Sequence, residues 1–311
     1  MLNQAPIPDI MGAGASRADF FSGAAAPKMK MAKKTAITFI GPGVMAEAMI
    51  AGLIRTGTAQ GKDLTAAGPR LERGEQLAEK YELAYTPENV EAARQADVLV
   101  IAVKPQQIAK ALHGVQGQLQ AGALVISIVA GVPVAQLKQM LDHQAVVRAM
   151  PNAPARIGKG ITVWTASPET SEAQRKQAEK VLSALGDTVF MEEESYLDKA
   201  TALSGTGPAY VYLFMEAMVD AGVHLGFPRR VAEQLVVQTL RGSVEFYDQS
   251  EEGPRHLARL RNQVTSPGGT SAEALYYLEK AGFRTALSRA IWAAYERSRQ
   301  LGKGEEQRPP D

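Results

Sequence analysis

The pattern of apolar and polar positions from Thr35 onward predicts short strands that alternate with helices. Strands are predicted at TAITFI and DLTAAG, and helices at VMAEAMIAGLIRTG, with Gly57 as its stop signal, and at the charged amphipathic RLERGEQLAEKY. Continuous apolar runs, typical of the middle of a parallel sheet, follow at ADVLVIAV, GALVISIVAG and AVVRAM, which Pro151 ends. This order predicts a doubly wound α/β domain.

The pattern changes after Gly186, where a last strand and an acidic turn are predicted at DTVFMEEESY. From there to the end only helices are expected, first in DKATALSGTGPAYVYLFMEAMVDAGVHLG, which Ser-Gly-Thr-Gly-Pro interrupts, then in RRVAEQLVVQTLRGSVEFYD and FRTALSRAIWAAYERSRQLG. Alanine-rich stripes let helices approach closely, which fits an all-helical domain packed within one chain or intertwined with a second copy. The sequence leaves both arrangements open.

The turn after the first strand carries a candidate nucleotide site. Gly41-Pro-Gly43-Val-Met-Ala46 follows a strand and opens a helix, which is the G-x-G-x-x-A form of the dinucleotide fingerprint. In that reading Gly41 permits the tight turn, Gly43 lets the backbone approach a pyrophosphate, and Ala46 allows helix and strand to pack closely. The alternative is a tight turn without a ligand.

The end of the second strand indicates which dinucleotide is bound. It reads Ala66-Ala67-Gly68-Pro69-Arg70, without the carboxylate that holds the ribose hydroxyls in NAD-selective sites. The nearby Arg70 and Arg73 favour a 2′-phosphate, so we expect NADPH to be preferred and NADH to be possible. The alternative is that both arginines are solvated helix residues.

Further polar groups follow the apolar strands, at the edge where open α/β sheets bind ligands. Ala102-Val103-Lys104-Pro105 could place a cation near the cofactor phosphates, and Ser127 to Gly131 closes the next strand. Asn152, between two prolines, offers an amide that can donate and accept, and we count it among the cofactor-binding residues.

The segment VTSPGGTSAEALYYLEKAGF, from Val264 to Phe283, has two interpretations. Thr270 and Glu273 fit a capping box at the start of a helix that Gly282 closes. A glycine pair before a helix also exposes backbone N–H groups at its positive end, which suits a small carboxylate or phosphate. The residues of the stretch alone do not separate the two.

Composition narrows the class of protein. A chain of 311 residues with 45% hydrophobic residues and a net charge of +1 has no charge imbalance for nucleic acid or an acidic membrane. Cysteine is absent and four histidines are scattered singly, so we expect no metal site, and a cytoplasmic location is compatible. The apolar run ALVISIVAGV is too short to span a bilayer. Residues 1–30 lack the features of a secretory signal or transit peptide.

A resemblance to the pyrroline-5-carboxylate reductase family runs from about Thr35 to Gly302. It is carried by FIGPGVMAEAMIAGL, DVLVIAVKPQ, VISIVAGV, VVRAMPNAPARIGKG, TALSGTGPAYVYLFMEAMVDAGVHLG, QLVVQTLRGS and VTSPGGTSAEALYYLEKAGF. The resemblance implies reduction of 1-pyrroline-5-carboxylate to L-proline with NAD(P)H, the last step of proline biosynthesis. It also implies a homodimer, with a ring of dimers as the higher oligomer.

The same resemblance sets the expected domains. We expect an NAD(P)-binding Rossmann-like domain at 31–195 and a helical dimerisation and substrate domain at 196–302. Residues 1–30 are expected to be a disordered extension or a mis-assigned start, and 303–311 a disordered tail.

The resemblance also assigns site residues. The substrate carboxylate is expected at Ser266, Gly268, Gly269 and Thr270, and Ser271, with Thr270, is expected to direct the ring nitrogen, although a threonine is commoner at position 271. The expected nucleotide contacts are Ile40, Gly41, Pro42, Gly43, Val44, Met45, Asn89, Ala102, Val103, Lys104, Pro105, Ile128, Val129 and Ala130. Val44 departs from the polar residue often found there, and Leu257 replaces a usual proline.

A cyclic imine substrate also fits the absence of an evident general acid, because a protonated imine is already an electrophile that needs only positioning. Two other functions stay open. A hydroxy-acid dehydrogenase would carry a lysine four residues after Gly207, where this chain has Val211. A non-catalytic NADP-binding regulator on the same fold would need no second anion site.

Overall fold

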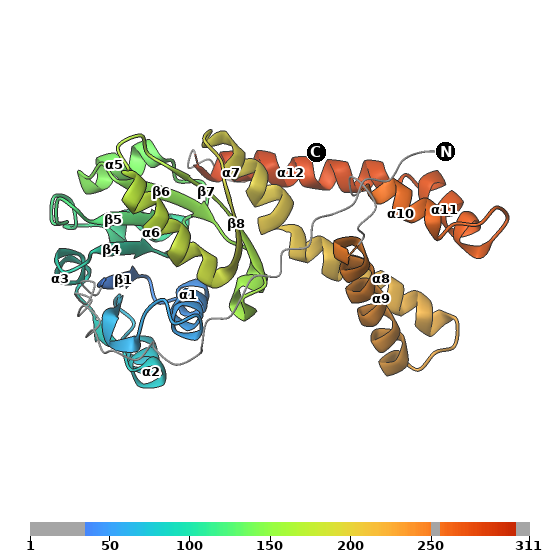
Figure 1. Ribbon diagram of the computed structural model, residues 1–311, viewed down its shortest axis with the longest axis horizontal. Coiled ribbons are helices and arrows are strands. Elements are labelled where there is room, and N and C mark those ends of the chain that lie inside the picture. Colours follow the sequence, from blue (N-terminus) through green and yellow to red (C-terminus); the bar gives the residue numbers. More distant parts are fainter. Residues whose placement is uncertain (1–34, 250–255, 303–311) are drawn as a thin grey trace, which may run out of the picture. The chain divides into compact units, whose positions relative to one another are not determined.

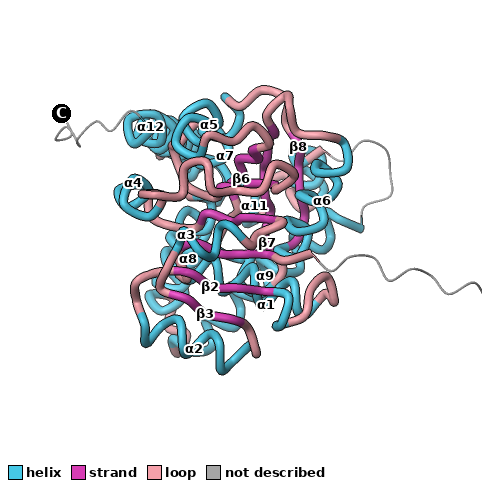
Figure 2. Tube along the Cα trace, turned by 90° about the vertical axis from the view of Figure 1, so that its left-hand side faces the viewer, coloured by secondary structure: helices cyan, strands magenta, loops and turns pink. Residues whose placement is uncertain are grey.

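The structure is a computed structural model that describes residues 35–249 and 256–302. The expected extension at 1–30 and tail at 303–311 lie outside these residues. The described chain forms an eight-stranded sheet (Figures 1 and 2) in the order β3-β2-β1-β4-β5-β6-β7-β8. The strands are β1 (Ile37–Ile40), β2 (Leu64–Ala67), β3 (Ala84–Thr86), β4 (Val98–Ile101), β5 (Leu124–Ser127), β6 (Val146–Met150), β7 (Gly160–Ala166) and β8 (Gly186–Phe190). All pairs are parallel except β6 with β7.

Helices cover both faces of this sheet. They are α1 (Val44–Arg55), α2 (Leu71–Tyr81), α3 (Asn89–Arg94), α4 (Ile108–Ala111), α5 (Val134–Leu141) and α6 (Glu172–Leu182). Alternate strand residues point to opposite faces, so Phe39 packs in one apolar cluster with α1, α2 and α6 while Ile40 packs in the other with α3, α4 and α5. Both residues are fully buried. The predicted doubly wound α/β domain is confirmed.

The remainder is helical, as predicted. It contains α7 (Ser195–Ala200), a π-helical turn (Thr201–Gly205), α8 (Gly207–His224), α9 (Arg229–Gln249), α10 (Leu257–Gln263), α11 (Thr270–Lys280) and α12 (Phe283–Gly302). The π-helical turn falls where Ser-Gly-Thr-Gly-Pro interrupts the apolar pattern. Leu257 begins α10 at the position where a proline is tolerated best.

A buried arginine joins the sheet to this helical part. Arg148 of β6 is 4% exposed and its guanidinium pairs with Glu194 and Asp198, each at 2.9 Å. Asp198 of α7 also accepts a hydrogen bond from the hydroxyl of Ser298 in α12, at 3.2 Å. The network therefore fixes α7 and the end of α12 against β6.

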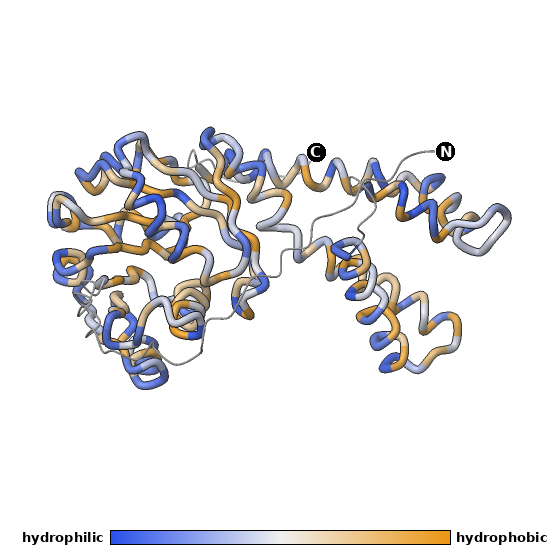
Figure 3. The backbone as a smooth tube through the Cα atoms, in the orientation of Figure 1, coloured by the Kyte–Doolittle hydropathy of each residue, from blue (hydrophilic) through white to orange (hydrophobic). Residues whose placement is uncertain are grey.

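The helices after α7 leave much apolar surface exposed. The core cluster between α8 and α9 contains only Val219, Ala232 and Val236 as buried residues. Leu213 is 67% exposed and Phe246 is 58% exposed, and Figure 3 shows hydrophobic segments along both helices. So large an exposed apolar surface is typical of a protein interface.

Candidate active site

The turns that follow β1, β2, β4 and β5 lie side by side at one edge of the sheet. In the strand register Ile40 is opposite Ala67 and Ile101, and Ile101 is opposite Ser127. Backbone bonds continue past the strand ends, from the Ala102 amide to the Ile40 carbonyl at 2.9 Å and from the Ile128 amide to the Ile101 carbonyl at 3.0 Å. The edge therefore gathers most residues expected at the nucleotide. These are Ile40 to Met45, Gly68, Ala102 to Pro105 and Ile128 to Ala130.

The glycine loop has the geometry that the fingerprint predicts. Gly41 has a φ of +89°, and a Cβ added there would stand 2.5 Å from Cγ1 of Val103 and 3.0 Å from its backbone nitrogen. A Cβ added to Gly43 would meet nothing closer than the Gly41 carbonyl oxygen at 3.9 Å. Ala46 is fully buried. Gly41 is thus needed for the turn, whereas Gly43 leaves an open backbone face at the start of α1.

The N-terminus of α1 is able to bind an anion. Gly43 is its N-cap without a side-chain cap, and the first helical bond runs from the Glu47 amide to the Gly43 carbonyl at 3.0 Å. Within the described chain the amides of Val44, Met45 and Ala46 have no hydrogen-bond partner. Free N–H groups at the positive end of a helix suit a phosphate. Val44 is 59% exposed there, and its apolar side chain adds no polar contact.

The two arginines near the second strand differ in their contacts. Arg70, the N-cap of α2, is exposed and has no ion pair or hydrogen bond in the described residues. Arg73 donates from Nε to the Pro42 carbonyl at 3.2 Å and pairs with Glu47. Of these two arginines, Arg70 is therefore the one free to bind a phosphate, and Arg73 is not a solvated helix residue.

The remaining nucleotide candidates have different surroundings. Asn89 donates to the Ala111 carbonyl at 2.9 Å, while its buried Oδ1 has no partner among the described residues, so it can accept from a ribose hydroxyl. Lys104 is exposed directly after β4 and forms no ion pair among the described residues. Asn152 accepts at Oδ1 from the Ile161 amide at 3.0 Å, so this oxygen fixes the start of β7. The groups at this edge fit a dinucleotide.

The Ser-Pro-Gly-Gly segment forms a tight turn before α11. The Gly269 amide donates to the Ser266 carbonyl at 3.1 Å, and Gly268 between them has a φ of +66°. Proline followed by a glycine of positive φ is typical of a type II turn. A Cβ on Gly269 would stand 2.4 Å from Oγ of Ser266, so a larger residue there would displace this hydroxyl from its present position.

The predicted capping box is wrong. Gly269 is the N-cap of α11, and Thr270 is the first helical residue, one position too late to cap. The Glu273 amide bonds to the Gly269 carbonyl at 3.2 Å, and no side chain caps the helix. The amides of Gly268, Thr270, Ser271 and Ala272 therefore have no partner in the described part of the chain, which favours the anion-site interpretation.

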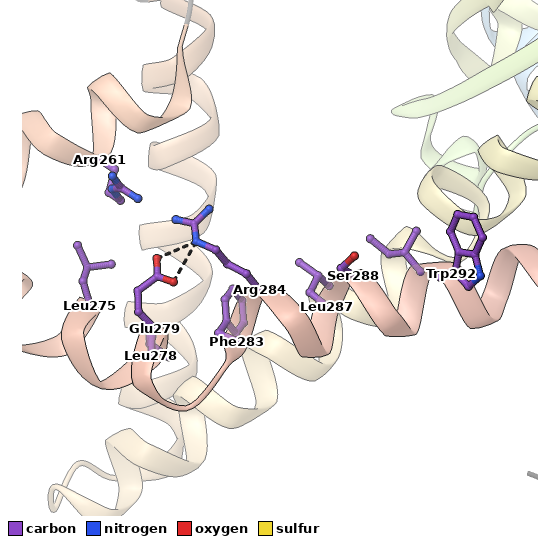
Figure 4. Close-up of a pocket in the computed structure, with 10 residues that line it drawn as sticks. Arg261, Leu275, Leu278, Glu279, Phe283, Arg284, Leu287, Ser288 and Trp292 are labelled. Atoms are coloured by element: carbon purple, nitrogen blue, oxygen red, sulfur yellow. Dashed lines mark hydrogen bonds and ion pairs between the residues drawn. The ribbon is translucent and has the colours of Figure 1, made fainter. Parts of the chain in front are cut away.

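Two sets of candidate residues are thus assembled separately. No hydrogen bond or ion pair within residues 35–249 and 256–302 joins Ser266 to Ser271 with the nucleotide loops. Close to the turn, α10, α11 and α12 form an apolar groove of about 630 Å³ (Figure 4). It is lined by Arg261, Leu275, Leu278, Glu279, Phe283, Arg284, Leu287, Ser288, Ile291 and Trp292, none of them a predicted site residue.

Glu47 was missed by the sequence reasoning. It accepts from Arg73, from Lys80 Nζ at 2.9 Å and from Tyr81 Oη at 3.1 Å. The hydrogen bond from Arg73 is the main cause that lowers the pKa of Glu47 to about 2. The available signal was its place in the first turn of α1, where the positive end of a helix favours an acidic side chain.

The fold and its loops define a class, the nucleotide-dependent oxidoreductases with a Rossmann-like domain and a helical second region. A family model described as pyrroline-5-carboxylate reductase dimerisation matches residues 194–301, and one described as NADP oxidoreductase, coenzyme F420-dependent, matches residues 36–131. The pyrroline-5-carboxylate reductase of Synechocystis is 41% identical over 264 residues, which cover 85% of this chain and 97% of that protein. That of Pseudomonas aeruginosa is 38% identical over 268 residues, 86% of this chain and 97% of the relative.

Solved structures agree with these relatives. The pyrroline-5-carboxylate reductase of Coxiella burnetii has a TM-score of 0.79 and 34% identity, covering 88% of this chain and 100% of its own. The Plasmodium falciparum pyrroline carboxylate reductase with NADP bound has a TM-score of 0.77 and 33% identity, covering 86% and 98%. The chain belongs to the pyrroline-5-carboxylate reductase family.

Among the described residues, no helix is both long and apolar enough to cross a bilayer. In the same residues no three His, Asp or Glu side chains cluster as metal ligands would.

Proposed function

We propose that this chain reduces 1-pyrroline-5-carboxylate to L-proline with a nicotinamide cofactor, the last step of proline biosynthesis. The observation that carries the proposal is the turn before α11, where the amides of Gly268, Thr270 and Ser271 have no partner in the described residues and Ser266 Oγ lies against Gly269 of the same turn. These donors suit the carboxylate of a cyclic imino acid. The names of the relatives and the nucleotide loops at the sheet edge support the same reaction.

The protein's part in the reaction is mainly positioning. The carboxylate is held by the turn, and Gly269, whose own amide closes the turn, contributes by lacking a Cβ. The half-buried Ser271 hydroxyl, with Thr270 next to it, accepts from the ring N–H and turns the imine carbon toward the nicotinamide. The cofactor supplies the hydride. As the hydride bonds to that carbon, the C=N electron pair passes to the nitrogen, which already carries its proton.

The cofactor is held by the sheet edge. Amides of Val44, Met45 and Ala46 bind the pyrophosphate, Asn89 Oδ1 accepts from a ribose hydroxyl, and Arg70 binds the 2′-phosphate. Because no carboxylate competes at the end of β2, NADPH is preferred and NADH is used less well. The other two functions have less support. Val211 is apolar and transfers no proton, and a regulator needs no second anion site.

The test is the oxidation of NADPH, followed by absorbance, with and without 1-pyrroline-5-carboxylate. We expect Ser271→Ala to lower kcat/KM about tenfold or more, because an oriented hydrogen bond is lost, and Ser271→Thr to retain activity. Ser288→Ala on α12 is the matched control and keeps full activity. Folded protein that binds NADPH but shows no substrate-dependent oxidation would refute the proposal.

Finer points follow from the same reading. The domains are 31–195 for the nucleotide and 196–302 for substrate and dimerisation, and the homodimer assembles further into a ring of dimers. The exposed apolar surface of α8 and α9 supports the dimer, and light scattering after size exclusion measures the number of chains. The absence of cysteine fits a reducing cytoplasm, which cell fractionation tests.

A further inference from the structure

Two side chains that are not among the expected nucleotide contacts, Glu47 and Arg73, support the glycine loop. Glu47 lies in the first turn of α1, and its two oxygens accept from Arg73, Lys80 and Tyr81, all on α2. Its side chain is 23% exposed and that of Arg73 is 26% exposed, so the pair is partly shielded from solvent. The first turn of α1 is thereby fastened to α2.

Arg73 also reaches the loop itself. Its Nε donates to the carbonyl of Pro42 at 3.2 Å, in the middle of the Gly-Pro-Gly turn. The next amide, that of Gly43, donates to the Gly41 carbonyl at 2.7 Å. In a trans peptide the C=O and the N–H point in opposite directions, so these two bonds fix the plane of the Pro42–Gly43 peptide from both sides. That plane sets where the open face of Gly43 points.

The guanidinium of Arg73 is already paired within the protein and is therefore not available to a phosphate. Its guanidinium faces the Glu47 carboxylate and the Pro42 carbonyl, and its hydrogen bond is the main cause of the lowered pKa of Glu47. Arg70, three residues earlier, is exposed without a partner in the described chain. The two arginines near the expected ribose therefore have different tasks.

We propose that Arg73, oriented by Glu47, is a positioning residue that presets the glycine loop for any nicotinamide dinucleotide, whereas Arg70 alone selects for the 2′-phosphate. The inference rests on the proposed cofactor site and assigns different roles to its two arginines. A residue that shapes the loop affects NADPH and NADH alike, while one that binds the 2′-phosphate affects only NADPH.

The experiment measures dissociation constants, by calorimetry, for NADPH, NADH, 2′,5′-ADP and 5′-ADP without substrate. For Arg73→Met we expect binding of all four to weaken by the same factor, about tenfold, which corresponds to one charge-assisted hydrogen bond. Glu47→Gln, which loosens Arg73, is expected to weaken all four by a smaller common factor, about threefold. Arg70→Met is expected to weaken only the two ligands with a 2′-phosphate.

Two controls separate positioning from stability. Arg55→Met removes an arginine that donates to a backbone carbonyl, that of Ala184 at 3.1 Å, at the other end of α1. It is expected to lower the melting temperature while all four dissociation constants stay as in the wild type. Arg73→Lys, which keeps the charge but reaches only one of the two partners, is expected to recover part of the lost affinity. Both variants remain informative if Arg73→Met folds poorly.

Two results would overturn the inference. If Arg73→Met or Arg73→Lys weakens NADPH and leaves NADH unchanged, Arg73 itself binds the 2′-phosphate. If the Arg73 and Glu47 variants melt lower but bind all four ligands normally, the pair only stabilises the fold. Failure of the proposed function is recognised separately, because the wild-type protein would then bind no NADPH or oxidise none.

Discussion

Two alanine substitutions, two residues apart, are expected to separate folding from nucleotide binding. At Gly41 the backbone is left-handed, with a φ of +89°, and a new Cβ would meet Cγ1 of Val103 at 2.5 Å and its backbone nitrogen at 3.0 Å. At Gly43 the φ is −85°, which any residue adopts, and a new Cβ meets nothing closer than 3.9 Å. One substitution is therefore strained in the free protein and the other is not.

The magnitudes follow from these contacts. Gly41→Ala costs about 1–2 kcal/mol for the left-handed backbone and about 1–3 kcal/mol for crowding against a backbone that cannot move aside. At roughly 2 °C per kcal/mol for a chain of this size, the melting temperature falls by about 4–10 °C. For Gly43→Ala the poorer cap costs about 0.5–1 kcal/mol, and the reduced entropy of the unfolded chain offsets about 0.4–1 kcal/mol. Its melting temperature stays within about 1 °C of the wild type.

For NADPH binding, we expect the substitution at Gly43 to have the larger direct effect. The methyl group of Gly43→Ala occupies the open face before the free amides of α1, so at least one charge-assisted hydrogen bond to the pyrophosphate is lost. We expect NADPH to bind about 10–100-fold more weakly. Thermal melting and fluorescence titration with NADPH measure the two effects. If Gly43→Ala melts as low as Gly41→Ala and binds NADPH normally, the reasoning about the open face is wrong.

Three further predictions concern the rest of the molecule. The lowered pKa of Glu47, about 2 in the folded protein, means that its carboxylate stabilises the fold above about pH 5 and loses this contribution as the pH falls toward 2. After allowance for solvent screening this is about 1–2 kcal/mol, so urea unfolding of Glu47→Gln should depend less on pH between 5 and 3; an unchanged slope contradicts it. Gly269→Ala would place a Cβ 2.4 Å from Oγ of Ser266 and is expected to raise the KM for substrate about fivefold or more while the Kd of NADPH stays constant; a changed Kd would count against two separate sites. Arg148→Met leaves two carboxylates without their buried partner and is expected to lower the free energy of unfolding by about 3 kcal/mol, and a loss below about 1 kcal/mol would show that the network is dispensable.

Local signals predicted most of the sheet, and long-range pairing decided the rest. The apolar runs at β1, β4, β5 and β6 are buried at every strand position except Met150, so their composition was sufficient. Neither β3 nor β7 was predicted. The first is only three residues long with none of them buried, and the second mixes buried and half-buried residues. β7 lies between β6 and β8, antiparallel to β6 and parallel to β8, and this placement depends on pairing with other strands rather than on its own residues.

The site was predictable where its chemistry lies within a few residues. The features that define the Gly41 to Ala46 turn belong to residues within it: the positive φ of Gly41, the open face of Gly43 and the buried Ala46. Arg73 and Glu47 are 26 positions apart in the sequence, and no local pattern around Arg73 predicts their contact. The start of α11 was placed one residue late because the turn decides which glycine is left-handed: Gly268 takes that role, and Gly269 becomes the cap.

With the proposed homodimer, the thin core between α8 and α9 would make the helical half of the chain dependent on protein concentration. Three buried residues supply little of the free energy that two helices of 18 and 21 residues need, and we expect association of chains to supply more. Dilution below the dissociation constant of that dimer is then expected to melt the helices after α7 first and to leave the sheet with its covering helices folded. Such a preparation would still bind NADPH but have no turnover. Concentrating the same sample would restore its activity.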